Sequence, residues 1–301
     1  MSTEPPTAEG EPPVLYETDG RVAIITLNRP ATANAQDSAL LYALDDAFHR
    51  FSQDDELGVA ILRGAGKHFS SGHDLSAAGM ADYEVPYPRR SMWWDHVGKT
   101  AADNWLSRES EVYLGFCRRW RELPKPTIAM VHGACIAGGL MLAWACDLIV
   151  ASDDASFSDP VIRMGAPGVE YFAHPWEMGP RRAKEFLFLG DAIDAAEAYR
   201  VGMVNHVWPR DELDGRTREL AHKIATRGRF ALALAKMAVN RSEDAMGHRA
   251  GIDSVFGLHQ LAHVQSLHES GSPIRGEDAR STRDAIADDA AAADDDNNST
   301  R

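Results

Sequence analysis

The sequence predicts an α/β fold built around one large domain, and three observations support this prediction. Short runs of apolar and β-branched residues are typical of buried strands. The segments between several of these runs carry apolar residues at helical spacing, and strands that alternate with helices are typical of an α/β core. The chain has 301 residues, which is long enough to bury a sizeable hydrophobic core.

The core elements follow one another along the first two thirds of the chain. The first predicted strand is Val22–Leu27, which is rich in β-branched residues. A helix is predicted to follow from Asp37 to Phe51, because apolar residues recur there at helical spacing behind a capping Asp or Ser. A shorter helix is predicted at residues 138–145. Three further strands are predicted: residues 59–62, Thr127–Val131 and residues 148–150.

The pattern changes after Asn205, where helical periodicity continues with few strand signals. Three helices are predicted there: residues 211–226, residues 230–246 and His248–Ser270. We therefore predict a core over residues 14–207 and a helical C-terminal subdomain over residues 208–285.

Both ends of the chain differ in composition from the core. Residues 1–13 contain four prolines and three glutamates and lack the basic start and apolar stretch of a signal peptide. Residues 286–301 are of low complexity and acidic. We expect both segments to be disordered and the protein to be cytoplasmic.

The charge and the cysteines exclude several function classes. The formal net charge is −14, of which −3 comes from the N-terminal glutamates and −4 from the last fourteen residues. The remaining charge is still acidic and argues against a nucleic-acid binder, which usually has a basic face. No apolar run is long enough to cross a bilayer. Cys117, Cys135 and Cys146 lack metal-ligand spacing, so we expect buried thiols and no bound metal.

An aromatic-rich segment interrupts the core at residues 78–108. It contains two tyrosines and three tryptophans among prolines and charged residues, without clear periodicity. Loops of this length are usually functional or disordered. The aromatic content favours an ordered lid or pocket wall, and a surface loop with packed aromatic side chains is the alternative.

Two segments that lie far apart in the sequence each end a strand with glycine, namely residues 67–75 and residues 132–139. Glycine lets the backbone turn its N–H toward a ligand without a side chain in the way. The second segment also opens a helix, whose N-terminal amides favour negative charge. Two such amides converging on a thioester oxygen would stabilise an enolate, and losing one donor of this kind costs about 3 kcal/mol.

These segments resemble successive motifs of the enoyl-CoA hydratase (crotonase) superfamily, in the family's order, from residue 14 to residue 207. The matching stretches are NRP and NA within residues 28–35, GAGKHFSSGHDL at 64–75, PKPTIAMVHGACIAGGLMLAWACDLIVAS at 124–152 and AEAYRVGMVN at 196–205. The resemblance implies a spiral core of ββα units and a helical C-terminal trimerisation region. It also implies homotrimers or hexamers and an acyl-CoA thioester substrate, with no separate cofactor because the substrate carries coenzyme A.

The resemblance further implies roles for individual residues. The backbone N–H groups of His73 and Gly138 would form the oxyanion hole. Lys67, Ser71 and Leu75 fall where the family wraps the nucleotide and pantetheine of coenzyme A.

The sequence departs from the family at both catalytic positions. Enoyl-CoA hydratases use two glutamates to activate water and to handle the α-carbon proton. The resemblance places Met141 at the first of these positions and Val161 at the second. Neither side chain can move a proton, so the two-glutamate mechanism cannot be carried over.

Substitute groups must therefore come from nearby segments. Glu170 lies a few residues beyond the second missing glutamate and is our first choice for the proton-transfer base. A solvated loop carboxylate is the alternative. Asp159 could act in catalysis or cap the following turn. The side chain of His73 could also titrate near neutral pH within the site. His174 and Glu177 are candidates to line the pocket.

Three functions remain open on this basis. The first is an acyl-CoA lyase or isomerase that uses Glu170 or another non-standard carboxylate. The second is a thioester hydrolase or decarboxylase in which His73 or Asp159 activates water. The third is a non-catalytic acyl-CoA-binding protein that kept the oxyanion hole and lost the acid/base pair.

Overall fold

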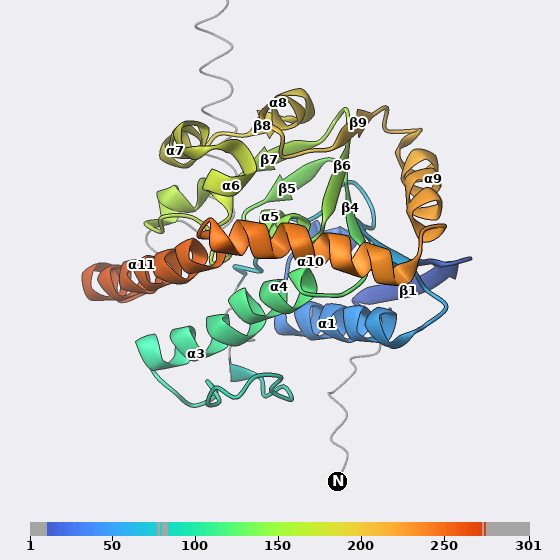
Figure 1. Cartoon of the computed structure of the whole chain (residues 1–301). Coiled ribbons are helices and arrows are strands. Elements are labelled where there is room, and N and C mark those ends of the chain that lie inside the picture. The colour runs from blue at the N-terminus through green and yellow to red at the C-terminus, as the bar shows by residue number, and fades with distance from the viewer. Residues whose placement is uncertain (1–10, 77–78, 80–83, 273, 275–301) are drawn as a thin grey trace, which may run out of the picture.

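A six-stranded sheet forms the centre of the molecule (Figure 1). The computed structural model describes residues 11–76, 79, 84–272 and 274. The strand order is β1-β2-β3-β4-β6-β9, in which β1 pairs with β2 in antiparallel fashion and the other neighbours are parallel. The strands are β1 (Val14–Asp19), β2 (Val22–Leu27), β3 (Val59–Gly64), β4 (Thr127–Val131), β6 (Leu148–Ser152) and β9 (His206–Trp208).

A second sheet of three short strands has the order β5-β7-β8. Strand β5 pairs with β7 in parallel, and β7 pairs with β8 in antiparallel fashion. These strands are β5 (Ala134–Ile136), β7 (Ser156–Ser158) and β8 (Ile193–Asp194). Strand β5 leads directly into the glycine pair that opens the next helix, so this sheet fixes the start of that helix.

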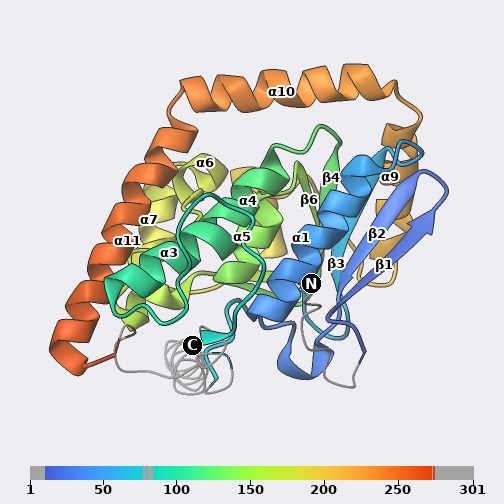
Figure 2. The same cartoon turned by 90° about the horizontal axis from the view of Figure 1, so that it is seen from below.

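Helices cover both faces of the large sheet (Figures 1 and 2). The α-helices are α1 (Ser38–Gln53), α3 (Ala102–Val112), α4 (Leu114–Arg121), α5 (Gly138–Trp144), α6 (His174–Met178), α7 (Pro180–Leu189), α8 (Ala195–Val201), α9 (Leu213–Ala225), α10 (Arg229–Ala245) and α11 (His248–Ser270). In the described part of the chain, the 3-10 turns with defined bounds include η1 (Pro30–Thr32) and η3 (Pro160–Met164).

The alternation of side chains along each strand creates two hydrophobic cores. On β2, Ala23 and Ile25 face the main core with α1, α4 and α5, whereas Val22 and Ile24 face a smaller core with α9. Both faces of the parallel strands are therefore buried, which explains why the sequence there is a continuous apolar run.

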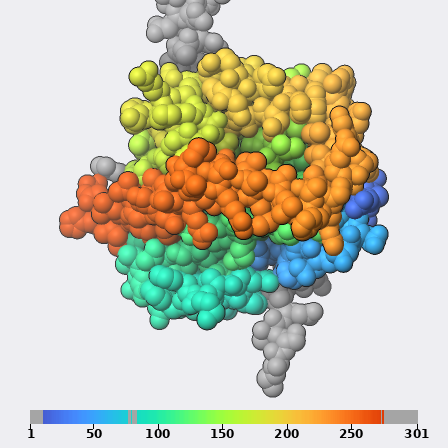
Figure 3. All heavy atoms as spheres, in the orientation of Figure 1, coloured from blue at the N-terminus to red at the C-terminus, as the bar shows by residue number. Residues whose placement is uncertain are grey.

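The C-terminal helices extend across the outside of the molecule (Figure 3). Helix α9 packs on the sheet, α10 has no buried residue, and α11 lies against α3. Among the described residues, no helix is both long and apolar enough to cross a membrane.

The predicted fold class is confirmed, and the core elements lie where the sequence placed them. Helix α1 begins behind Asp37, whose side chain accepts a hydrogen bond from the N–H of Leu40. The three predicted C-terminal helices are α9, α10 and α11. Residues 1–10 and 275–301 lie outside the described residues, so the prediction of disordered ends is not tested.

The aromatic-rich segment differs from its prediction, because residues 102–108 belong to helix α3. The sequence did not predict this helix because most of the side chains that it buries are polar. Asn104, Ser107, Arg108, Glu109 and Glu111 are all buried. A helix with a polar buried face has no hydrophobic periodicity to detect.

Candidate active site

The two glycine-containing segments lie side by side in the structure. Ser70 bridges to the β5 segment, accepting a hydrogen bond from the N–H of Ile136 at 3.0 Å and donating its own N–H to the carbonyl of Ala134 at 3.2 Å. A Cβ on Gly72 would lie 3.0 Å from the backbone nitrogen of Gly138. Gly72 also has a φ of +89°, so glycine is required at this contact for two reasons.

The start of helix α5 is equally crowded. A Cβ on Gly138 would lie 2.7 Å from Cε1 of His73 and 2.8 Å from Oε1 of Gln36. Ala137, the N-cap residue, has a φ of +47° and a ψ of −111°, a conformation that costs about 1–3 kcal/mol for a residue with a Cβ. Among the described residues, the backbone N–H groups of His73 and Gly138 donate no hydrogen bond to the protein. No acceptor in the described part of the chain therefore competes for these two N–H groups.

The His73 side chain lies between this backbone and a buried carboxylate. Its Nε2 is 3.0 Å from Oε2 of Glu170, and its ring stacks on Tyr113 with 3.8 Å between the ring centroids. The Nδ1 atom is buried and has no hydrogen-bond partner in the described part of the chain. It lies 2.8 Å from the position that a Cβ on Gly138 would take. One ring nitrogen thus faces Glu170 and the other lies beside Gly138.

Glu170 is not a solvated loop residue, because its exposed fraction is only 4%. Its Oε1 lies 3.4 Å from Nε2 of His259 on α11. Burial alone would raise the pKa of Glu170, but the imidazoles of His73 and His259 outweigh burial and hold this pKa well below its usual range. Conversely, burial would lower the pKa of His259, but Glu170 and Glu109 raise it to about 9. Glu170 is therefore an ionised carboxylate in contact with two imidazole rings, those of His73 and His259.

The loop that carries Glu170 is held at two points. The N–H of Val169 donates to Oδ2 of Asp159 at 3.1 Å, and the carbonyl of Gly168 accepts from Nδ1 of His259 at 2.8 Å. Asp159 is fully buried, and the same Oδ2 lies 2.8 Å from Nε2 of His174. Asp159 is the N-cap residue of η3, but its side chain makes no capping hydrogen bond, so the capping alternative is wrong. The carboxylate holds the Glu170 loop and His174 instead.

A second buried carboxylate, Glu109 of α3, lies beyond His259. Oε1 of Glu109 is 3.1 Å from Nε2 of His263, and Oε2 accepts a hydrogen bond from Nε2 of Gln260. Oε2 is also 4.0 Å from Nε2 of His259. No sequence motif predicted Glu109, His259 or His263 as site residues. The only local signal was the spacing of the two histidines, which lie four residues apart on one helix.

The two residues that the resemblance places at the positions of the family glutamates are buried in the core. Met141 in α5 and Val161 in η3 are both buried and apolar. Trp144 also belongs to the core, where its ring meets the edge of His174. Glu177 in α6 is half-buried, and burial together with the nearby charge of Glu243 raises its pKa to about 8.

The residues predicted to hold coenzyme A lie on the segment around the first glycine motif. Lys67 is exposed, whereas Ser71 and Leu75 are half-buried. The hydroxyl of Ser71 donates to the carbonyl of Thr32 at 3.3 Å. Asp74 is bound by Arg29 at 3.2 Å, which agrees with a structural role in this loop.

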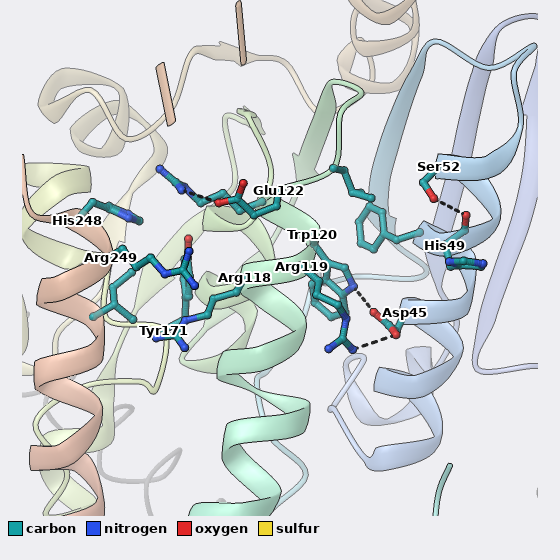
Figure 4. Close-up of a pocket in the computed structure, with 14 residues that line it drawn as sticks. Asp45, His49, Ser52, Arg118, Arg119, Trp120, Glu122, Tyr171, His248 and Arg249 are labelled. Atoms are coloured by element: carbon teal, nitrogen blue, oxygen red, sulfur yellow. Dashed lines mark hydrogen bonds and ion pairs between the residues drawn. The ribbon is translucent and has the colours of Figure 1, made fainter. Parts of the chain in front are cut away.

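A cavity of about 380 Å³ opens between α1, α4 and α11 (Figure 4). Arg118, Arg119, Arg121 and Arg249 contribute to its wall, and none of the predicted site residues does. Three of these arginines form ion pairs with neighbouring carboxylates: Arg118 with Asp253, Arg119 with Asp45, and Arg121 with Glu243. This cavity is therefore distinct from the site around His73.

Comparisons with known proteins agree with this fold. The model of the family described as enoyl-CoA hydratase/isomerase matches residues 17–270. The chain is 48% identical over 266 residues to the putative enoyl-CoA hydratase EchA13 of Mycobacterium tuberculosis, covering 87% of this chain and 84% of that protein. It is also 33% identical to the short-chain-enoyl-CoA hydratase of Clostridium acetobutylicum, covering 83% of this chain and 87% of the relative.

Solved structures show the same relationship. A probable enoyl-CoA hydratase from Mycobacterium smegmatis is 50% identical, with a TM-score of 0.78 and coverage of 87% of this chain and 98% of that one. A probable enoyl-CoA hydratase from Mycobacterium thermoresistibile is 48% identical with the same coverage and a TM-score of 0.79. The chain belongs to the enoyl-CoA hydratase/isomerase family.

Proposed function

We propose that this protein is an acyl-CoA lyase of the enoyl-CoA hydratase type, in which the His73–Glu170 pair replaces the usual two glutamates. The observation that carries this proposal is the position of His73. Its Nε2 lies 3.0 Å from the buried Glu170 carboxylate, while its Nδ1 lies beside Gly138 without a hydrogen-bond partner among the described residues. A base that is oriented by a carboxylate is a recurring catalytic arrangement.

The proposed oxyanion hole consists of the backbone N–H groups of His73 and Gly138. Both groups lie on segments that contact each other, and neither donates to the described part of the protein. Gly138 is also the first residue of α5, where the helix leaves its N–H groups without intrahelical partners. Two such donors would stabilise the negative oxygen of a thioester enolate.

The proton transfers follow from the orientation of His73. The ionised Glu170 holds a proton on Nε2, which leaves Nδ1 as the basic nitrogen. Nδ1 takes a proton from water while the water oxygen bonds to the β-carbon, and the electrons of the Cα=Cβ bond move into the thioester enolate. Nδ1 then transfers this proton to the α-carbon as the enolate collapses. One molecule of water is added, and the protein ends in its starting state.

The first test follows short, medium and aromatic enoyl-CoAs in deuterated water by mass spectrometry. We expect a product of hydrated mass, and we expect His73→Asn and Glu170→Gln each to lower kcat by at least about 100-fold. Glu219→Gln, an exposed glutamate on α9, should leave kcat unchanged and serves as the matched control.

Other outcomes would replace the proposal with a specific alternative. Bond migration or deuterium uptake without hydration would make the protein an isomerase. Release of free coenzyme A would favour a thioester hydrolase, and loss of carbon dioxide from a carboxylated acyl-CoA would favour a decarboxylase. Tight binding with no turnover of any thioester would make it a non-catalytic acyl-CoA-binding protein.

We also propose that the chain assembles into a homotrimer or a hexamer of two trimers. Support comes from α10, which has no buried residue and exposes apolar side chains such as Phe230, with an exposed fraction of 77%. An exposed apolar helix face of this kind usually marks an interface. Light scattering should therefore give a multiple of three chains, and Phe230→Glu should shift the population toward single chains.

A further inference from the structure

We propose that Glu109, His259 and His263 form a binding site for a divalent transition-metal cation such as Zn²⁺ or Co²⁺. The site lies between α3 and α11, behind Glu170. It is separate from the proposed oxyanion hole, and it does not depend on the proposed lyase activity, because binding can be measured without any substrate.

The three side chains already converge on one point. One ligand atom from each residue lies within 4.8 Å of the other two. Nε2 of His263 is 3.1 Å from one carboxylate oxygen of Glu109, and Nε2 of His259 is 4.0 Å from the other. Two ligands at about 2.1 Å from a tetrahedral Zn²⁺ are about 3.4 Å apart. Small side-chain movements would thus be enough to complete the coordination.

The two histidines come from one rigid element. His259 and His263 are four residues apart on α11, which places both rings on the same side of the helix, and their ring centroids are 4.6 Å apart. The helix therefore presents two nitrogen ligands in a fixed geometry before any cation arrives. Such preorganisation reduces the entropic cost of binding.

The atoms behind the ligands support this role. Nδ1 of His259 contacts the carbonyl of Gly168 at 2.8 Å, so this contact occupies Nδ1 and Nε2 is the nitrogen that a cation would bind, in place of the proton on Nε2. Gln260 donates a hydrogen bond to the carboxylate of Glu109. Histidine ligands commonly donate their second ring N–H to a carbonyl, and ligating carboxylates are commonly hydrogen-bonded.

Burial and charge favour a cation at this position. Glu109 is 2% exposed and His259 is 4% exposed. Glu170 adds a second buried carboxylate, with Oε1 at 3.4 Å from Nε2 of His259. A doubly charged cation would balance two buried carboxylates that water cannot solvate.

The donor set indicates the class of metal. Two imidazole nitrogens and one carboxylate suit Zn²⁺, Co²⁺ and related transition metals, whereas Mg²⁺ and Ca²⁺ prefer sites made only of oxygen ligands. Three protein ligands leave a fourth position for water or for Glu170. The cation would tie α3 to α11 and hold His259 in place behind Glu170.

The test titrates untagged, metal-stripped protein with Co²⁺ and follows the visible absorption of the bound ion. We expect saturation at one Co²⁺ per chain and displacement by Zn²⁺ but not by Mg²⁺. His263→Ala and Glu109→Gln should each weaken Co²⁺ binding by at least about tenfold, with the folded state checked by circular dichroism. His268→Ala removes an exposed histidine from the same helix and should change nothing.

Two results would overturn the site. Co²⁺ binding that is equally strong in wild type, His263→Ala and Glu109→Gln would show that the ion sits elsewhere on the chain. The absence of Co²⁺ or Zn²⁺ binding to the folded wild-type protein would show that Glu109, His259 and His263 form a hydrogen-bonded and ion-paired cluster without a metal. Neither result would affect the hydration assay, so failure of this site and failure of the proposed lyase activity can be told apart.

Discussion

The two halves of the candidate site are built in different ways. One half is backbone, formed by the segments around Gly72 and Gly138, and its contacts link strands and turns that follow a family pattern. The other half is a cluster of buried and half-buried side chains: Glu170 from a loop, Glu109 from helix α3, and His259 and His263 from helix α11. The backbone half depends on the absence of side chains, whereas the cluster depends on their identity.

This difference shows how the two halves tolerate change. In the backbone half, a Cβ at Gly138 would lie within 2.8 Å of His73 and Gln36 side-chain atoms, so any larger residue requires those side chains or the start of α5 to move. In the cluster, histidines from two different elements contact Glu170: His73 at 3.0 Å and His259 at 3.4 Å. A scaffold with a fixed oxyanion hole can therefore receive its acid/base group from a different element, as we propose for Glu170 and His73.

The largest effect is expected for Gly138→Ala, which perturbs the backbone half of the site. The new Cβ would lie 2.7 Å from Cε1 of His73, so the ring or the start of α5 must move. We expect kcat for enoyl-CoA hydration to fall by about 100- to 1000-fold, comparable to losing one oxyanion-hole donor.

Gly215→Ala in α9 is the matched control, because a Cβ there would meet no atom within 4 Å. It should keep full activity and stabilise the helix slightly. Wild-type turnover in Gly138→Ala would show that this N–H does not hold the thioester oxygen.

The next largest effect is expected for Asp159→Ala, which removes the carboxylate that holds the Glu170 loop. Removal of the carboxylate leaves His174 buried without its partner and frees the N–H of Val169. We expect the free energy of unfolding to fall by about 3 kcal/mol, measured by urea denaturation.

Asp211→Ala removes an exposed aspartate and should leave stability unchanged. A collapse of kcat in Asp159→Ala without any loss of stability would instead indicate that Asp159 takes part in the chemistry. That outcome would favour the hydrolase interpretation.

The smallest effect concerns His132, which lies before β5 in the backbone half. Burial, with a contribution from the charge of Arg210, lowers the pKa of His132 to about 4. The folded state therefore resists protonation, while the unfolded chain takes up a proton below about pH 6.5. Stability from the neutral ring is present above pH 6.5 and is lost as pH falls toward 4, by about 2 kcal/mol between pH 7 and pH 5.

His132→Gln keeps a side-chain donor for the carbonyl of Gly66, which His132 contacts at 3.1 Å. Urea denaturation at both pH values should show a smaller drop in the variant than in wild type. An equal drop in both proteins would mean that other groups cause the acid sensitivity.

The sequence alone determined the α/β class, the central strands and the positions of the three C-terminal helices. These features depend on local patterns, namely apolar runs, helical spacing and glycines after strands. Such patterns can be recognised in the sequence without knowledge of the fold. The two glycine motifs also predicted which backbone segments would meet, and the structure brings Gly72 and Gly138 together. Glu170 was selected from its place near an expected glutamate.

Only the tertiary structure decided the surroundings of Glu170. His73, Glu109 and His259 are separated from it by 97, 61 and 89 residues in the chain, and no local pattern links them. The sequence did not predict helix α3, because this helix buries mostly polar side chains instead of an apolar stripe. One of these buried polar side chains is Glu109, which belongs to the cluster. Local spacing predicts how the backbone folds, whereas a buried polar cluster exists only where distant elements are packed together.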